Sequence, residues 1–64
     1  MEIELVTFDK KNILLEGHYL IRTETLHGRI NYMKSMVTFN PSKDEMIVDV
    51  RNQKVTHISK SKIH

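Results

Sequence analysis

The side chains best suited to chemistry in this chain are basic and aromatic. Arg22, Arg29 and Tyr32 flank one predicted turn, and no acidic residue follows Asp49. In sheets that bind single-stranded nucleic acid, aromatic rings stack on bases while Lys and Arg side chains contact the phosphates. These features predict a nucleic-acid or anion site made of Arg22, Arg29, Tyr32, Arg51, Lys54, His57 and Lys60.

Other interpretations of the sequence remain open. Tyr19 and Tyr32 can be core residues, with the charged side chains serving only to keep a small protein in solution. An adaptable apolar patch can instead bind a protein partner, as an inhibitor or accessory subunit would, through that patch or through a strand edge. Its candidate residues are Leu20, Met33, Met36 and Phe39. A third possibility is a small-ligand pocket at an interface between subunits.

Catalytic and metal-binding chemistry find little support in the sequence. The four histidines are far apart and there is no cysteine, so a zinc site would depend on the fold alone. Two isolated glycines cannot build a phosphate-binding loop, and the serines lie in no nucleophile motif. We therefore expect a non-enzymatic protein without a metal or other cofactor.

Size and charge set further limits. A chain of 64 residues is one domain, and a core of this size contributes only about 3–5 kcal/mol of stability. Without disulfides, a chain this small commonly gains stability by self-association, so we expect a homo-oligomer. The net charge of +2 is uneven, because residues 1–32 hold four Lys/Arg against five acids and residues 33–64 hold six against three.

The N-terminus predicts the cellular location. It is acidic where a signal peptide would be basic, and no stretch approaches the ~20 apolar residues of a membrane helix. We therefore expect a cytoplasmic protein that does not enter a membrane.

The elements that must position the candidate residues are strands. Recurring Ile, Val, Thr, Tyr and Phe predict a mainly β domain over residues 1–59, followed by a basic, frayed tail at 60–64. We expect five or six short antiparallel strands in sequential hairpins, at residues 2–8, 13–16, 18–25, 29–40, 45–51 and 55–59. Such a sheet forms a small barrel, or stays open and dimerises. A helical spacing of Ile30, Met33 and Val37 leaves a short helix over 29–37 as an alternative.

Turns fix which residues face each other. A two-residue turn at His27-Gly28 suits the positive φ that glycine accepts. That turn predicts the pairs Thr25–Ile30, Thr23–Tyr32, Ile21–Lys34 and Tyr19–Met36. A second two-residue turn at Asn52-Gln53 predicts the pairs Val50–Val55 and Ile47–Ile58.

Overall fold

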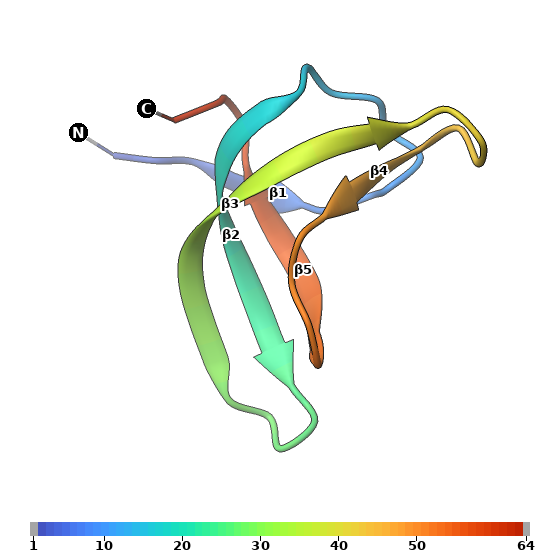
Figure 1. The fold of residues 1–64 in the computed structure, drawn as a ribbon. Coiled ribbons are helices and arrows are strands. Elements are labelled where there is room, and N and C mark those ends of the chain that lie inside the picture. Colours follow the sequence, from blue (N-terminus) through green and yellow to red (C-terminus); the bar gives the residue numbers. More distant parts are fainter. Residues whose placement is uncertain (1, 64) are drawn as a thin grey trace.

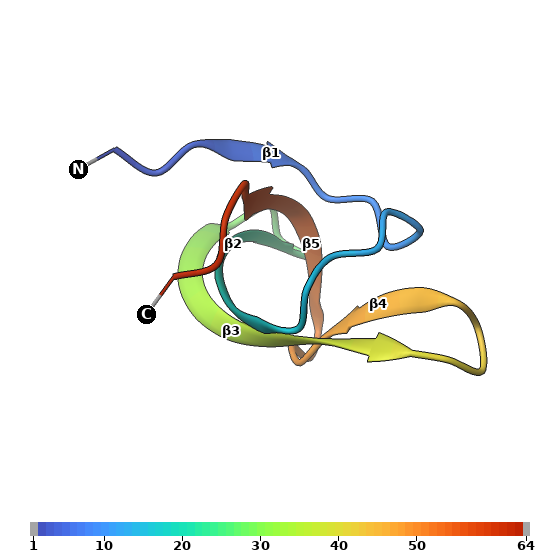
Figure 2. The same cartoon turned by 90° about the horizontal axis from the view of Figure 1, so that it is seen from above.

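The computed structural model describes residues 2–63 and consists of strands joined by loops. The strands are β1 (Leu5–Thr7), β2 (Gly17–Thr25), β3 (Ile30–Asn40), β4 (Glu45–Val48) and β5 (Gln53–Ser59). They form one curled antiparallel sheet in the order β1-β5-β2-β3-β4 (Figure 1, Figure 2). The predicted mainly β fold of five or six antiparallel strands is confirmed, and β3 occupies the segment where a short helix was the alternative.

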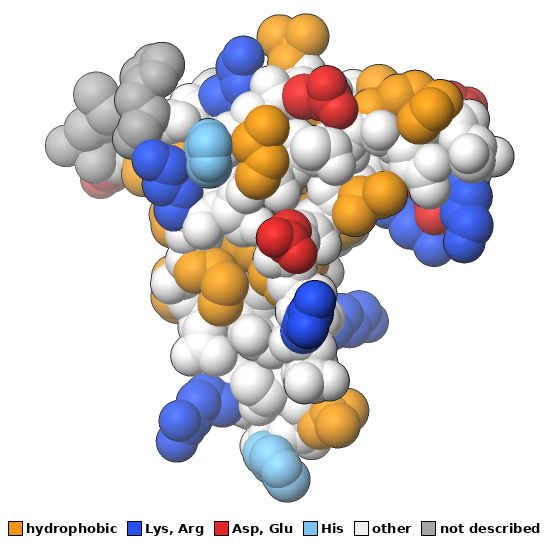
Figure 3. Space-filling model, in the orientation of Figure 1, with side chains coloured by type: hydrophobic (Ala, Val, Ile, Leu, Met, Phe, Trp, Pro, Cys, Tyr) orange, Lys and Arg blue, Asp and Glu red, His pale blue; other side chains and the backbone are white. Residues whose placement is uncertain are grey.

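Two of the connections between the described strands are hairpins, namely β2–β3 and β3–β4. The β2–β3 hairpin extends from the body of the molecule as an arm (Figure 1, Figure 3). β5 lies between β1 and β2 and pairs with both, so the predicted pairs Val50–Val55 and Ile47–Ile58 are wrong. Asn52 at φ 58° turns the chain away from β4. In its observed place β5 has strand partners on both edges at His57 and Ile58.

The strand expected at residues 13–16 is absent, and these residues form part of the connection between β1 and β2. Side chains hold this connection in place of a strand ladder. The Tyr19 hydroxyl donates to the Leu15 carbonyl (2.7 Å), and a Glu16 carboxylate oxygen accepts from the Phe39 N–H (2.8 Å). Leu14 packs against the core, whereas Leu15 is exposed. Neighbouring apolar side chains of this segment therefore lie in the core and in solvent, and the segment forms no strand ladder.

The basic segment after β5 is held against the sheet over residues 60–63. The Lys60 N–H donates to the Glu4 carbonyl (2.9 Å), and the Ile63 N–H donates to the His18 carbonyl (2.8 Å). The sequence predicts a frayed tail over residues 60–64. In the structure, residues 60–63 are instead bonded to β2 and to Glu4, the residue before β1. His64 lies outside the described residues.

The core lies inside the curl of the sheet. Ile21 and Ile58 are cross-strand partners on β2 and β5, and both are buried. Together with Tyr19, Val37 and Met46 they form the buried cluster. Partly buried apolar side chains surround it, namely Phe8, Leu14, Met33, Phe39, Val48, Val50 and Val55. Because side chains alternate along a strand, the residues between those that face the core, such as Leu20 and Arg22 on β2 and Tyr32 on β3, point to the outer face.

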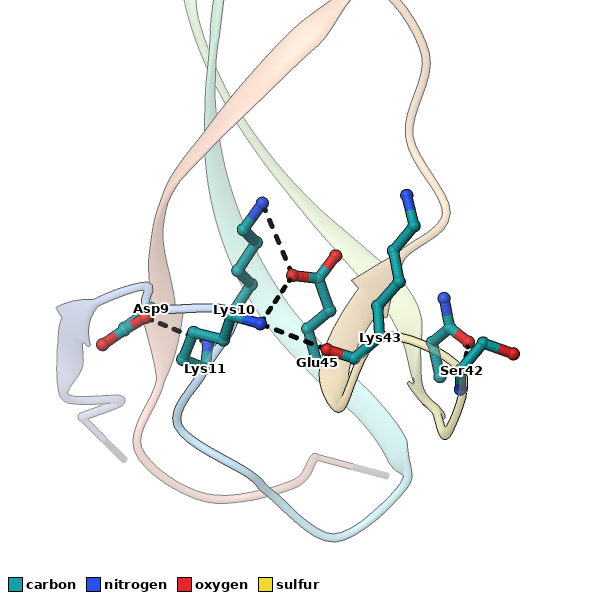
Figure 4. Close-up of polar contacts among 7 residues, drawn as sticks. Asp9, Lys10, Lys11, Ser42, Lys43 and Glu45 are labelled. Carbon is teal, nitrogen blue, oxygen red and sulfur yellow. Dashed lines mark hydrogen bonds and ion pairs between the residues drawn. The ribbon is translucent and has the colours of Figure 1, made fainter.

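The loop after β1 reaches across to β4, the strand at the other end of the sheet order. The Met46 N–H donates to the Lys10 carbonyl (2.8 Å). The Lys10 and Lys11 ammonium groups lie 3.6 and 3.3 Å from the same Glu45 carboxylate oxygen. Lys11 Nζ also donates to the Lys43 carbonyl at 3.1 Å (Figure 4). These contacts join the two outer parts of the curled sheet at one place.

Glu45→Gln should lower stability in a pH-dependent way. Partial burial raises the pKa of Glu45, but hydrogen bonds and charges from Lys11 and Lys10 outweigh it and lower the pKa below its ordinary 4.5. A carboxyl with a lowered folded-state pKa stabilises the fold above its unfolded pKa and loses that effect as pH falls through the folded value. We expect the variant to melt below the parent at pH 7, with the difference shrinking below pH 4.5.

The measurement is the melting temperature by circular dichroism from pH 7 to pH 2.5. Glu24→Gln is the matched control, because Glu24 is exposed and makes no ion pair among residues 2–63. A difference between parent and Glu45→Gln that is the same at pH 7 and pH 2.5 would contradict the role of the charge.

Candidate nucleic-acid interface

The turn between β2 and β3 sets which candidate residues reach the outer face. The Thr25 N–H donates to the Arg29 carbonyl (2.9 Å), and the Gly28 N–H donates to the Thr25 carbonyl (3.0 Å). Gly28 has φ 80°. A three-residue loop of this kind combines a tight turn with a left-handed glycine. The predicted two-residue turn at His27-Gly28 is therefore wrong, because Leu26 also belongs to the loop.

The extra loop residue shifts the register by one position. The pairs Thr23–Tyr32 and Tyr19–Met36 expected from sequence are wrong, as are Thr25–Ile30 and Ile21–Lys34. Tyr32 lies opposite Arg22, and Tyr19 lies opposite Ser35. A shift of one residue moves side chains to the other face of a sheet. The two tyrosines consequently separate, with Tyr19 in the core at 3% exposure and Tyr32 outside at 61%.

The corrected register brings three predicted site residues into one line across the outer face. Tyr32 on β3 pairs with Arg22 on β2, and Arg22 pairs with His57 on β5. Thr7 on β1 continues the line beyond His57. We call Tyr32, Arg22 and His57 the outer row. It places an exposed ring, a guanidinium and an imidazole on neighbouring strands.

A β-bulge organises the polar end of the outer row. The register between β2 and β5 shifts after Arg22, which leaves Thr56 as the extra residue of β5. The Thr56 hydroxyl accepts from Arg22 Nη1 (2.6 Å) and donates to the Arg22 carbonyl (3.2 Å). His57 Nδ1 lies 3.0 Å from the same hydroxyl. The bulge thus fixes the orientation of both Arg22 and His57.

Two exposed lysines flank the outer row. Lys34 follows Tyr32 on the same face of β3 and lies opposite Leu20, and Lys54 lies opposite Glu24. The outer face around the row therefore carries more positive than negative charge. Such a balance attracts phosphate groups.

The other predicted residues lie apart from the row. Arg29 is in the arm, where its N–H bonds to the Thr25 hydroxyl (3.1 Å). Arg51 is in the turn before β5, and Lys60 lies beyond β5, 3.8 Å from the Glu4 carboxylate. Figure 3 shows Lys and Arg side chains in several separate groups on the face drawn. The outer row and the flanking Lys54 therefore lie together, whereas the other three predicted residues are dispersed over the surface.

The sequence reasoning missed Thr56 and Lys34. Nothing in the local sequence marks Thr56 as a bulge residue, because the bulge depends on how β5 meets β2. Lys34 could have been found from the alternation of β3 once Tyr32 was known to face outward. With the two-residue turn, the expected register placed Lys34 opposite Ile21.

The apolar patch considered as a protein-binding site is divided by the sheet. Met33 and Phe39 pack against the core. Met36 points outward and is exposed, and Leu20 is half-buried on the same face. The patch therefore does not form one surface.

Residues 2–63 include no helix of the length and apolarity that a membrane span requires. In comparisons with known proteins, no family model, curated protein or solved structure matches this chain.

Proposed function

We propose that this chain is a non-enzymatic binding protein that holds single-stranded nucleic acid on its outer row. The observation that carries the proposal is the position of Tyr32, which is 61% exposed and is the cross-strand partner of Arg22 on the outer face. A tyrosine used only for packing would be buried, as Tyr19 is. Exposed aromatic rings next to Arg side chains on a sheet are the elements that stack bases and contact phosphates.

Each member of the outer row has a distinct role in this proposal. Tyr32 stacks on a base, and Arg22 contacts the neighbouring phosphate with the N–H groups that Thr56 leaves free. His57 offers its second ring nitrogen, because Nδ1 is directed at Thr56. Neighbouring strands are about 4.8 Å apart, so the row covers roughly 10 Å of a bound strand. Lys34 and Lys54 add charge on either side.

Tyr32→Ala should weaken the binding of a single-stranded 12-mer about tenfold, because one stacked base contributes about 1–3 kcal/mol. Fluorescence anisotropy of labelled dT12 at several salt concentrations measures this. The slope of log K against log salt should stay unchanged in Tyr32→Ala and become about 0.7 less steep in Arg22→Gln. Tyr32→Phe keeps the ring and should bind like the parent.

Leu15→Ala is the matched control, since Leu15 is exposed and lies in the loop before β2. It should leave affinity unchanged. The proposal fails if no oligonucleotide binds at low salt, or if Tyr32→Ala binds as tightly as Leu15→Ala.

A second candidate function is self-association through the open edge of β1. The Phe8 N–H donates to the Thr56 carbonyl, and the Glu4 carbonyl accepts from the Lys60 N–H. Backbone groups alternate along an antiparallel strand, so the N–H and carbonyl groups of Leu5 and Thr7 point away from β5. Unpaired edges of this kind accept another strand. A molar mass that doubles with concentration in sedimentation equilibrium would support a homo-oligomer, and a constant monomer mass would reject it.

A further inference from the structure

A groove of about 530 Å³ lies at the end of the sheet beside the outer row. It lies where the end of β2 meets the start of β5, which pair with each other there and project at the same end of the molecule (Figure 1). Its volume falls within the range of about 300–1,000 Å³ that is usual for ligand sites. The lining residues are Glu24, Thr25, Leu26, Asn52, Gln53 and Lys54.

A hydrogen-bond network holds the amide of Gln53 on the inner face of the sheet, on the side opposite to Glu24 and Lys54. The hydroxyl of the fully buried Thr23 donates to Gln53 Oε1 (2.5 Å), and Asn31 Nδ2 donates to the same oxygen (3.3 Å). The oxygen is therefore occupied. Gln53 thus belongs to the inner face, and the charged groups that can meet a ligand in the groove are those of Glu24 and Lys54 on the outer face.

The rim of the groove adds a carboxylate, an ammonium group and an apolar wall. Glu24 and Lys54 are cross-strand partners, yet no ion pair joins them in the described part of the chain. Both groups are exposed and line the groove. Leu26 is 94% exposed at the tip of the arm. A side chain that is this apolar and this exposed can cover the face of a flat ligand.

We propose that the groove takes a guanine base of the strand bound on the outer row, an inference that rests on the proposed function. Guanine presents two adjacent donors, N1–H and the N2 amino group, beside the O6 acceptor. One carboxylate accepts from both donors, which assigns them to Glu24, while the Lys54 ammonium group on the same face of the sheet donates to O6. Adenine presents a ring acceptor where the carboxylate requires a donor, and thymine presents one N–H between two carbonyl oxygens. Single-stranded nucleic acids are selected through such base edges.

The test uses labelled dT12 and 12-mers in which one central thymidine is replaced by guanosine, inosine or adenosine. The parent protein should bind the guanosine strand about tenfold more tightly than dT12, the effect of one good two-bond base contact. Inosine lacks the N2 amino group, so its strand should fall between the two. The adenosine strand should show no gain.

Glu24→Gln should change two affinities in opposite directions. Loss of a negative charge should slightly raise the affinity for dT12, while loss of the carboxylate should abolish the preference for guanosine. Glu2→Gln is the matched control, because it removes one exposed negative charge outside the groove. It should raise general affinity and keep the preference.

The outcomes separate this inference from the proposed function. Equal binding of all four strands by the parent, or a guanosine preference that survives Glu24→Gln, overturns the guanine site and leaves strand binding intact. Failure of every strand to bind at low salt overturns strand binding itself, and the guanine site with it. The inosine strand tests the donor pattern without any protein variant.

Discussion

Ile21→Ala is expected to leave the protein largely unfolded at 25 °C. Ile21 is 0% exposed and lies on β2, with Met33 on one side and Ile58 on the other. Truncating a buried Ile to Ala costs about 2–5 kcal/mol, since transfer energy is lost and a cavity remains. A core of this size supplies only about 3–5 kcal/mol. One substitution therefore removes most of the stability.

Circular dichroism with urea titration measures this loss. Ile21→Val removes one methylene group and should cost about 0.5–1.5 kcal/mol, leaving a cooperative transition at lower urea. Ile47→Ala is the surface control, because Ile47 is 46% exposed on β4 and its truncation should shift the midpoint only slightly. A cooperative transition of Ile21→Ala near the parental midpoint would contradict the placement of the core.

The strands could be predicted where local chemistry decides them. β2, β3 and β4 have runs of β-branched and aromatic residues between clear breaks, and their positions agree with the prediction. Residues 13–15 are also a run of apolar residues, yet the side-chain bonds of Tyr19 and Glu16 hold this segment as a loop. The place of β5 between β1 and β2 depends on long-range pairing. No pattern within β5 specifies its two neighbours.

The candidate site was only partly predictable for a related reason. The residue types of the outer row, Tyr32, Arg22 and His57, were identified from sequence, but their arrangement depends on register. Register in a hairpin follows from the length of its loop. A glycine at the end of the loop fits both a two-residue and a three-residue turn, so the sequence alone leaves two registers open.

Gly28→Val tests whether this turn fixes the register. Gly28 has φ 80°, a conformation that a β-branched residue rarely adopts. No atom lies within 4 Å of a β-carbon placed there, so the cost comes from the backbone and not from a clash. A strained residue of this kind costs about 1–3 kcal/mol. For a domain of this size each 1 kcal/mol lowers the melting temperature by about 4–8 °C.

Gly28→Asn separates backbone strain from the mere loss of glycine, because Asn tolerates positive φ better than other residues. We expect Asn to melt near the parent and Val to melt about 10 °C or more below it. If the turn sets the outer row, the folded fraction of Gly28→Asn should also keep the parental affinity for dT12. Equal melting temperatures for Val and Asn would mean that the left-handed glycine does not fix the hairpin. The register that places Tyr32 beside Arg22 would then need another cause, such as the burial of Ile21 and Thr23 between their neighbours on β3 and β5.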